Sequence, residues 1–267
     1  MSSPSEWLAL VRWRNAVLAG LGVFAGAWWS AGRLTTGVGA GILAALALTA
    51  VANTTNDIAD VNIDRVAHPE RPLAAGAIDL EAARRFAIAC SILAVAVAAA
   101  VAWWMAALTA VVVAIMWLYS SHLKPRGLPG NTAVAVLGSL PFLYGAGAVD
   151  EVGKGVLLVT VAAPLHFARE VAKDLEDAPA DAGARQTLPV SHGARTARAA
   201  VAAGVAVYSA AVALLMTSYP LFALLLVPTI FLAVLAVRRL YHERAGAAAL
   251  LKAAMVLAIG ALVASAR

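Results

Sequence analysis

The hydrophobic pattern of the chain consists of long apolar runs separated by short polar segments. A helix needs about 20 mostly apolar residues to cross a bilayer. Nine runs approach this length, so the pattern predicts an all-α membrane protein with nine transmembrane helices. The predicted helices cover residues 15–32, 37–56, 84–102, 104–120, 131–149, 153–172, 197–217, 219–237 and 246–265.

The composition supports a lipid environment. Hydrophobic residues make up 62% of the 267 residues and charged residues 13%, whereas soluble domains carry about 25% charged residues. The formal net charge of +5 comes from residues in short loops between apolar runs, which favours anionic lipid or an anionic substrate over nucleic acid. Cys90 is the single cysteine, so a disulfide framework is excluded. No separate soluble domain is left over, so residues 1–267 are expected to form one domain.

Positive charge is divided unequally between the two sets of loops. Of the 20 Lys and Arg residues, only Arg33, Lys154 and Arg267 fall on the side opposite the N-terminus. Loops rich in Lys and Arg stay on the cytoplasmic side of a membrane. The sequence therefore predicts a multi-pass protein of the inner or plasma membrane. Its long loops, about residues 57–83 and 173–196, are expected to face the cytoplasm and to carry the function.

A first acidic cluster follows the second predicted helix, in the segment NDIADVNID. Asn56, Asp60 and Asp64 recur every fourth residue, so on a helix they share one face. Asp57 lies about 100° around the same helix and would approach from the side. The pattern predicts a group of oxygen ligands at the end of a span.

A second acidic cluster follows the sixth predicted helix. Asp174, Asp177 and Asp181 share one face if the helix continues that far. Both clusters follow even-numbered spans and therefore emerge on the same side of the membrane. Carboxylates at a helix C-terminus face the negative end of the helix dipole and repel one another, so we expect bound cations.

The ligand types favour magnesium. Oxygen ligands without His or Cys suit Mg²⁺, which binds through one or two carboxylates together with water and substrate phosphates. Two facing clusters are expected to hold several Mg²⁺ ions on one diphosphate. A solvated acidic loop is the alternative for either cluster. A calcium loop is disfavoured because neither cluster has the EF-hand spacing or its glycine.

Basic residues near the clusters are candidates to bind the phosphates, although positive-inside topology or lipid contact would also place them there. His166 is a candidate to line the same cavity. The basic candidates and their neighbours are Arg12, Arg14 and Asn15 at the first helix, Arg71 after the first cluster, Lys124 and Arg126 after the fourth helix, and Arg169 and Lys173 before the second cluster.

Together these segments resemble the UbiA superfamily of intramembrane prenyltransferases. NDIADVNID followed by HPERPLAAG is similar to the first Asp-rich motif of that superfamily, and REVAKDLEDAPADAGARQTLP is similar to the second. The resemblance spans nearly the whole chain. It implies a ring of nine helices around a central cavity that opens laterally to lipid. It also implies a reaction in which Mg²⁺ helps to ionise a prenyl diphosphate and the prenyl cation passes to an acceptor.

The resemblance assigns roles residue by residue. Asn56, Asp60 and Asp64 match metal and diphosphate ligands of the first motif, with Asp57 beside them, and Asp174, Asp177 and Asp181 match those of the second; Asp60, Asp64, Asp174 and Asp177 are the catalytic candidates. The substrate-binding candidates are Arg12, Asn15, Asn56, Arg71, Tyr119, Lys124, Arg169 and Lys173. An acidic residue and a glycine expected before Asp181 are replaced by Ala178-Pro179-Ala180, and Pro179 is expected to break the helix there.

The acceptor is the open question at the level of sequence. LVRWRN, YSSHLKPRGLPGN and LPFLYGAG resemble most the branch that alkylates a hydroxyl of geranylgeranylglyceryl phosphate with geranylgeranyl diphosphate, in membrane lipid biosynthesis. An aromatic acceptor such as 4-hydroxybenzoate, homogentisate or a naphthoate is the alternative. Glu170, Asp177 or the leaving phosphate is a candidate base. A transporter is the remote alternative, because the acids cluster at one surface rather than at the midplane. No nucleic acid and no obligate protein partner are predicted.

Overall fold

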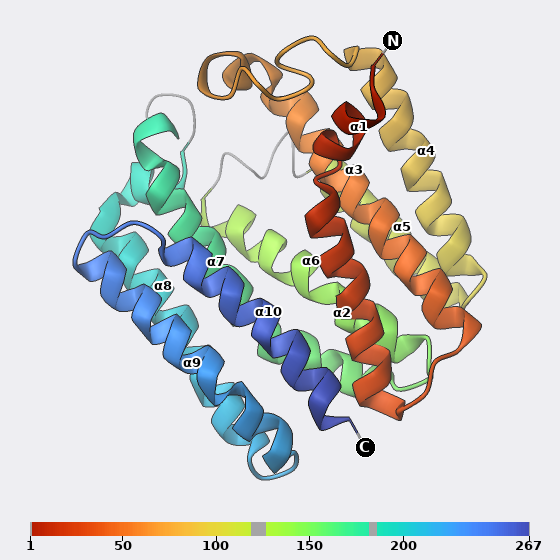
Figure 1. The fold of residues 1–267 in the computed structure, drawn as a ribbon, viewed down its shortest axis with the longest axis vertical. Coiled ribbons are helices and arrows are strands. Elements are labelled where there is room, and N and C mark those ends of the chain that lie inside the picture. Colours follow the sequence, from red (N-terminus) through yellow and green to blue (C-terminus); the bar gives the residue numbers. More distant parts are fainter. Residues whose placement is uncertain (1, 119–126, 182–185, 267) are drawn as a thin grey trace.

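The protein is helical throughout the part that the structure describes. The computed structural model describes residues 2–118, 127–181 and 186–266. Within these ranges the chain forms helices and no strands (Figure 1). The helices are α1 (Pro4–Leu10), α2 (Trp13–Ala31), α3 (Thr36–Ala67), α4 (Leu80–Ala99), α5 (Trp103–Leu118), α6 (Leu128–Gly147), α7 (Val152–Asp181), α8 (Leu188–Leu215), α9 (Pro220–Tyr241) and α10 (Ala247–Ser265).

Helices α2 to α10 follow the nine predicted apolar runs in order. Six of them, α3, α4 and α7 to α10, are long and apolar enough to cross a membrane by length and composition. The pair α1 and α2, bent by 60°, adds a seventh if it counts as one span. The chain is therefore a multi-pass membrane protein, and a ring of nine spans stays a prediction.

Two helices are much longer than a bilayer requires. α3 has 32 residues and α7 has 30, which correspond to about 48 Å and 45 Å of helix against a hydrocarbon core of about 30 Å. We infer that the C-terminal ends of α3 and α7 project beyond the hydrocarbon core. These two ends carry the two acidic clusters.

The short helix α1 precedes α2. Ser3 caps α1 and forms a capping box with Glu6. The chain then bends into α2 at Arg12, whose φ of 50° lies in the left-handed region. Leu10 packs against Leu73 and Ile78 from the segment after α3. This packing holds α1 against the segment that follows α3, the helix that carries the first acidic cluster.

Helices α2 and α6 approach each other closely at two glycines. A Cβ added to Gly145 would lie 1.9 Å from the carbonyl oxygen of Val23, and one added to Gly26 would lie 2.5 Å from the carbonyl oxygen of Phe142. Small residues permit this proximity, as is common in membrane helices. Helix α6 therefore packs closely on α2, and it also packs on α7 (Figure 1).

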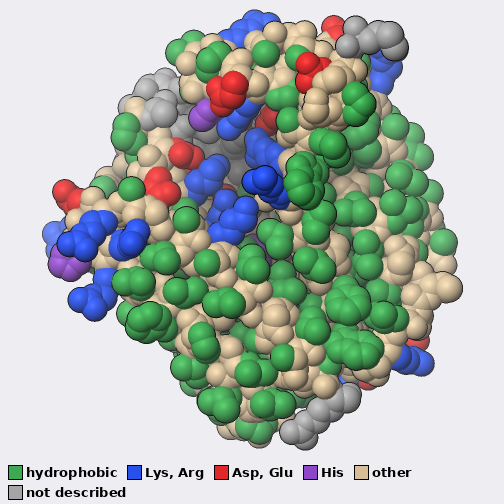
Figure 2. Space-filling view, viewed as in Figure 1, with side chains coloured by type: hydrophobic (Ala, Val, Ile, Leu, Met, Phe, Trp, Pro, Cys, Tyr) green, Lys and Arg blue, Asp and Glu red, His purple; other side chains and the backbone are tan. Residues whose placement is uncertain are grey.

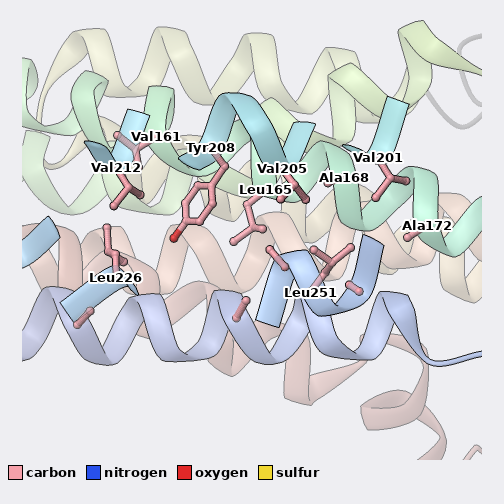
Figure 3. Packing of buried hydrophobic residues seen from close by; sticks show 14 of the residues in the cluster. Val161, Leu165, Ala168, Ala172, Val201, Val205, Tyr208, Val212, Leu226 and Leu251 are labelled. Carbon is pink, nitrogen blue, oxygen red and sulfur yellow. The ribbon is translucent and has the colours of Figure 1, made fainter. Parts of the chain in front are cut away.

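The buried apolar residues form two main clusters. One lies among α2 to α6 and includes Val51 and Met105. The other lies mainly among α7 to α10, where Leu165, Val205 and Leu226 pack together (Figure 3). α10 also packs on α2, so the C-terminal helices close back onto the N-terminal ones.

Candidate active site

The helices enclose a large cavity between the two hydrophobic clusters. Its volume is 780 Å³, and residues of α2, α3, α6, α7 and α10 contribute most of its lining. The deep wall is mainly apolar, whereas the mouth carries acidic and basic side chains. Figure 2 shows the mouth as a hollow lined by Lys and Arg side chains with Asp and Glu around it. The cavity thus joins a polar entrance to an apolar interior.

Two tyrosines in the deep wall have their hydroxyl groups satisfied within the protein. The Tyr144 hydroxyl lies 2.5 Å from the hydroxyl of Thr109, and that of Tyr208 lies 2.5 Å from the hydroxyl of Thr229. Figure 3 shows Tyr208 among the apolar residues of α7 to α9. Because these two hydroxyls have partners, a long hydrocarbon chain can pack against them without leaving either one unpaired.

The first acidic cluster faces the cavity. Asn56, Asp60 and Asp64 all line it from α3, as their spacing predicts. Asp60 and Asp64 are buried, with 6% and 2% of their surface exposed. Both Asp64 oxygens accept a hydrogen bond from Arg71, at 2.8 Å and 2.7 Å. Arg71 also lines the cavity, so the segment after α3 folds back to place a cation beside the acids.

Asp57 has a different position. Its Oδ1 accepts a hydrogen bond of 2.8 Å from Arg12. Asp57 is buried and is not one of the cavity-lining residues, whereas Arg12 is. We infer that Asp57 fixes Arg12 at the mouth, and its predicted role as a metal ligand stays a prediction.

The second acidic cluster lies on α7 and faces the same cavity. Asp174 accepts a hydrogen bond of 3.0 Å from the side-chain amide of Asn131 on α6. Asp177 lies 3.6 Å from Lys173. Arg169 and Glu170 form an ion pair one turn deeper. All of these side chains line the cavity, so α7 brings acids and bases together opposite α3.

The expected break at Pro179 is wrong. α7 continues through Pro179 to Asp181. A proline removes only one intrahelical hydrogen bond, and Pro179 lies in the last turn of the helix, where little helix remains to be disrupted. Asp181 therefore stays on the same helix as Asp174 and Asp177.

Some predicted residues lie outside the part that the structure describes. They are Tyr119, Lys124, Arg126 and the side chain of Asp181. Asn15 and Arg12 both line the mouth, and the amide oxygen of Asn15 lies 3.3 Å from Nζ of Lys252 on α10. Three of the four predicted basic regions, represented by Arg12, Arg71, and Arg169 with Lys173, thus line one cavity with both acidic clusters.

Sequence reasoning missed two polar residues of the site. Asn131 positions Asp174, and Lys252 adds a cation from the last helix. Each is a single polar residue within a predicted apolar run, Asn131 at its start and Lys252 two turns into it, and this is the signal that the sequence offers. Lys252 is also one of the Lys and Arg residues on the positively charged side of the membrane, so topology alone would explain its position.

Among the described residues, no group of three or more His, Cys, Asp or Glu side chains is arranged to hold one metal ion. The acids of α3 and α7 instead face one another across a cavity. A metal bound there would take part of its coordination from water and from a phosphate ligand, as Mg²⁺ does in many phosphate-binding sites.

This fold and this site define a membrane prenyltransferase. The model of the UbiA prenyltransferase family matches residues 19–260, and the chain belongs to that family. The predicted transporter alternative is therefore wrong. The family match confirms the resemblance that the two Asp-rich motifs carry.

Relatives within the family are similar along 70% to 98% of this chain. Digeranylgeranylglyceryl phosphate synthase of Halobacterium salinarum strain R1 is 34% identical over an alignment of 269 positions that covers 98% of each chain. The synthase of the same name from Methanopyrus kandleri is 34% identical over 188 residues, 70% of this chain and 69% of that one.

Solved structures share the fold. A structure of digeranylgeranylglyceryl phosphate synthase has a TM-score of 0.81 at 23% identity and covers 98% of this chain and 97% of its own. A UbiA homologue from Archaeoglobus fulgidus bound to GPP and Mg²⁺ has a TM-score of 0.77 at 16% identity and covers 97% of this chain and 99% of its own. At these identities the likeness concerns the fold alone.

Proposed function

We propose that this chain transfers a geranylgeranyl group from geranylgeranyl diphosphate to a hydroxyl of geranylgeranylglyceryl phosphate, with Mg²⁺ as cofactor. The observation that carries the proposal is that the acids of α3 and α7 and their neighbouring cations surround the mouth of one cavity with an apolar interior. Such a site suits a diphosphate attached to a long hydrocarbon. The relatives named digeranylgeranylglyceryl phosphate synthase support this choice of acceptor.

The residues of the mouth fit magnesium. Asn56, Asp60 and Asp64 on α3 and Asp174 and Asp177 on α7 offer oxygen ligands only, which is the ligand set that Mg²⁺ prefers. When bound, Mg²⁺ would neutralise charge on the departing diphosphate. Asp181 on the same helix and Asp57 beside Asn56 are the remaining predicted ligands. Asp60, Asp64, Asp174 and Asp177 are proposed as the catalytic carboxylates.

The cations of the mouth have a separate role in the proposed reaction. Arg71, Arg169 and Lys173 line the cavity beside the acids, where they would bind diphosphate oxygens and stabilise the charge that develops on them. The apolar interior holds the hydrocarbon and excludes water from the reactive carbon. Bond breaking between C1 and the diphosphate oxygen is then followed by bond formation between C1 and the acceptor oxygen. Tyr119 and Lys124 are further proposed substrate-binding residues.

A specific observation favours an acceptor that carries its own phosphate. Of the Lys and Arg side chains that line the cavity in the described residues, Arg12, Arg71, Arg169 and Lys173 each lie within 4 Å of a carboxylate. Lys252 instead contacts the amide oxygen of Asn15. We infer that Lys252 is available for a second anion. An acceptor phosphate would fill that position.

We further propose the arrangement of the chain in the membrane. Helices α2 to α10 would form a ring of nine spans within one domain of residues 1–267, with the cavity mouth on the cytoplasmic side. The distribution of Lys and Arg supports this orientation.

The proposed function is tested by giving membranes that contain the chain labelled geranylgeranyl diphosphate, Mg²⁺ and one acceptor at a time. We expect a labelled ether product with geranylgeranylglyceryl phosphate and none with 4-hydroxybenzoate or homogentisate. Membranes without the chain provide the background. Product with an aromatic acid alone would contradict the proposed acceptor.

Lys252→Met is expected to weaken recognition of the acceptor phosphate. KM for geranylgeranylglyceryl phosphate should rise by about 10- to 100-fold, because a charge-assisted hydrogen bond contributes roughly 1.5–3 kcal/mol. KM for geranylgeranylglycerol, which lacks the phosphate, should change little. The measurement is a comparison of initial rates with the two acceptors.

The matched control for this experiment is Arg238→Met. Arg238 is exposed near the end of α9 and does not line the cavity, so its removal should leave both KM values unchanged. An equal rise in KM for the two acceptors in Lys252→Met would show that Lys252 does not recognise the phosphate.

A further inference from the structure

His166 marks a boundary in the cavity wall. On α7, the cavity-lining residues on the deep side of His166 are Leu158, Val161, Ala162 and Leu165, and all are apolar. On the other side, Arg169 begins the charged part of the lining. His166 lies eight residues before Asp174, which is about 12 Å along the helix. Its side chain therefore lies between the site for the diphosphate and the site for the hydrocarbon.

The His166 ring has no hydrogen-bond or ion-pair partner within the described part of the chain. Most other polar side chains of the described lining have one, including Arg169 with Glu170 and Lys173 with Asp177. The ring is partly buried and keeps some exposed surface. His166 lines the cavity, so a ligand in the cavity can supply the missing partner.

The His166 ring packs against Gly138 on α6. A Cβ at position 138 would be 2.7 Å from Nδ1 of His166 and 3.0 Å from Cε1. The absence of a side chain on Gly138 thus makes room for the imidazole. Gly138 also lines the cavity, so the ring lies at the junction of α6, α7 and the substrate space.

Formation of an ether from a hydroxyl releases a proton, and a base must accept it. The carboxylates of Glu170 and Asp177 already lie next to Arg169 and Lys173. A neutral imidazole carries one nitrogen with a free lone pair, and histidine is the most frequent general base in enzymes. The position of His166 between the two parts of the cavity is where C1 of the prenyl group would meet the acceptor.

We propose that His166 is the base that accepts the proton of the acceptor hydroxyl. The bond between C1 and the diphosphate oxygen breaks, and the diphosphate leaves with the electron pair. The acceptor oxygen supplies the pair for the new bond to C1, and its proton passes to a ring nitrogen of His166. The proton then moves to water when the product leaves. This role rests on the proposed function.

The test measures two reactions of the His166→Gln variant: transfer to the acceptor, which needs the base, and release of diphosphate, which does not. Transfer to geranylgeranylglyceryl phosphate should fall by about 100-fold or more, the usual scale for loss of a general base. Mg²⁺-dependent release of diphosphate without an acceptor should fall far less, because that reaction does not use the acceptor proton. His192→Gln is the matched control, since His192 is exposed on α8 and does not line the cavity.

A second variant tests the chemistry of the ring. In His166→Ala, added imidazole should restore part of the lost transfer, whereas a purely structural defect would not respond to imidazole. Retention of more than half of the transfer rate in His166→Gln would overturn the proposal. So would a parallel loss of transfer and diphosphate release. A wild type that releases diphosphate but forms no ether would instead contradict the proposed function, and this role with it.

Discussion

Asp60→Asn is expected to lower Mg²⁺-dependent release of diphosphate by about 10²–10³-fold, the scale on which enzymes lose activity when one group that stabilises developing negative charge is removed. Asp60 lines the cavity, has 6% of its surface exposed and lies between Asn56 and Asp64 on one helix face. The asparagine has the same shape without the negative charge. Asp174→Asn should cause a comparable loss from the opposite side of the cavity, since Asp174 also lines it.

The matched control for both variants is Asp150→Asn. Asp150 is exposed between α6 and α7, and its φ of 66° suits asparagine as well as aspartate. The Asp150→Asn variant should release diphosphate at the wild-type rate. The rates are compared at equal amounts of folded protein. If Asp60→Asn or Asp174→Asn keeps full Mg²⁺-dependent turnover, the assignment of that residue as a metal ligand is wrong.

Gly145→Ala is expected to destabilise the folded protein by about 3 kcal/mol or more, at the upper end of the usual cost of overpacking. The new Cβ would lie 1.9 Å from the carbonyl oxygen of Val23 and 2.7 Å from the backbone nitrogen of Ala27. Both are backbone atoms of α2, so relief requires α2 and α6 to separate. The loss of stability is measured by heating the purified protein in detergent and recording the fraction that remains monodisperse at each temperature.

Gly260→Ala provides the same chemical change without the contact. Gly260 lies within α10, and a Cβ there would have nothing within 4 Å. The variant should unfold at the wild-type temperature or slightly above, because alanine favours helix over glycine. Equal stability of Gly145→Ala and Gly260→Ala would contradict the close contact between α2 and α6.

The order of the long helices could be predicted from the sequence because lipid imposes a simple requirement. An apolar run of about 20 residues must form a helix to satisfy its backbone in a bilayer. Each of the nine predicted runs corresponds to one helix from α2 to α10. The facing acidic clusters followed from helical spacing together with the order of the spans, and the structure places Asp60 and Asp174 in one cavity.

Contacts between distant segments could not be predicted from the same pattern. The hydrogen bond from Asn131 to Asp174 and the contact between Lys252 and Asn15 join residues on different helices. Periodicity gives the face of a helix but not its neighbour. The partner of Asp57 is Arg12, which reaches it because the chain bends between α1 and α2.

The most direct test of the proposed function is a competition in one vessel. The purified protein receives Mg²⁺, limiting labelled geranylgeranyl diphosphate and equal concentrations of geranylgeranylglyceryl phosphate, 4-hydroxybenzoate and homogentisate, and the products are identified by mass. We predict that the label appears in the ether of geranylgeranylglyceryl phosphate, and that chelation of Mg²⁺ abolishes its formation. Label in a prenylated aromatic acid, with none in the ether, would contradict the proposed function.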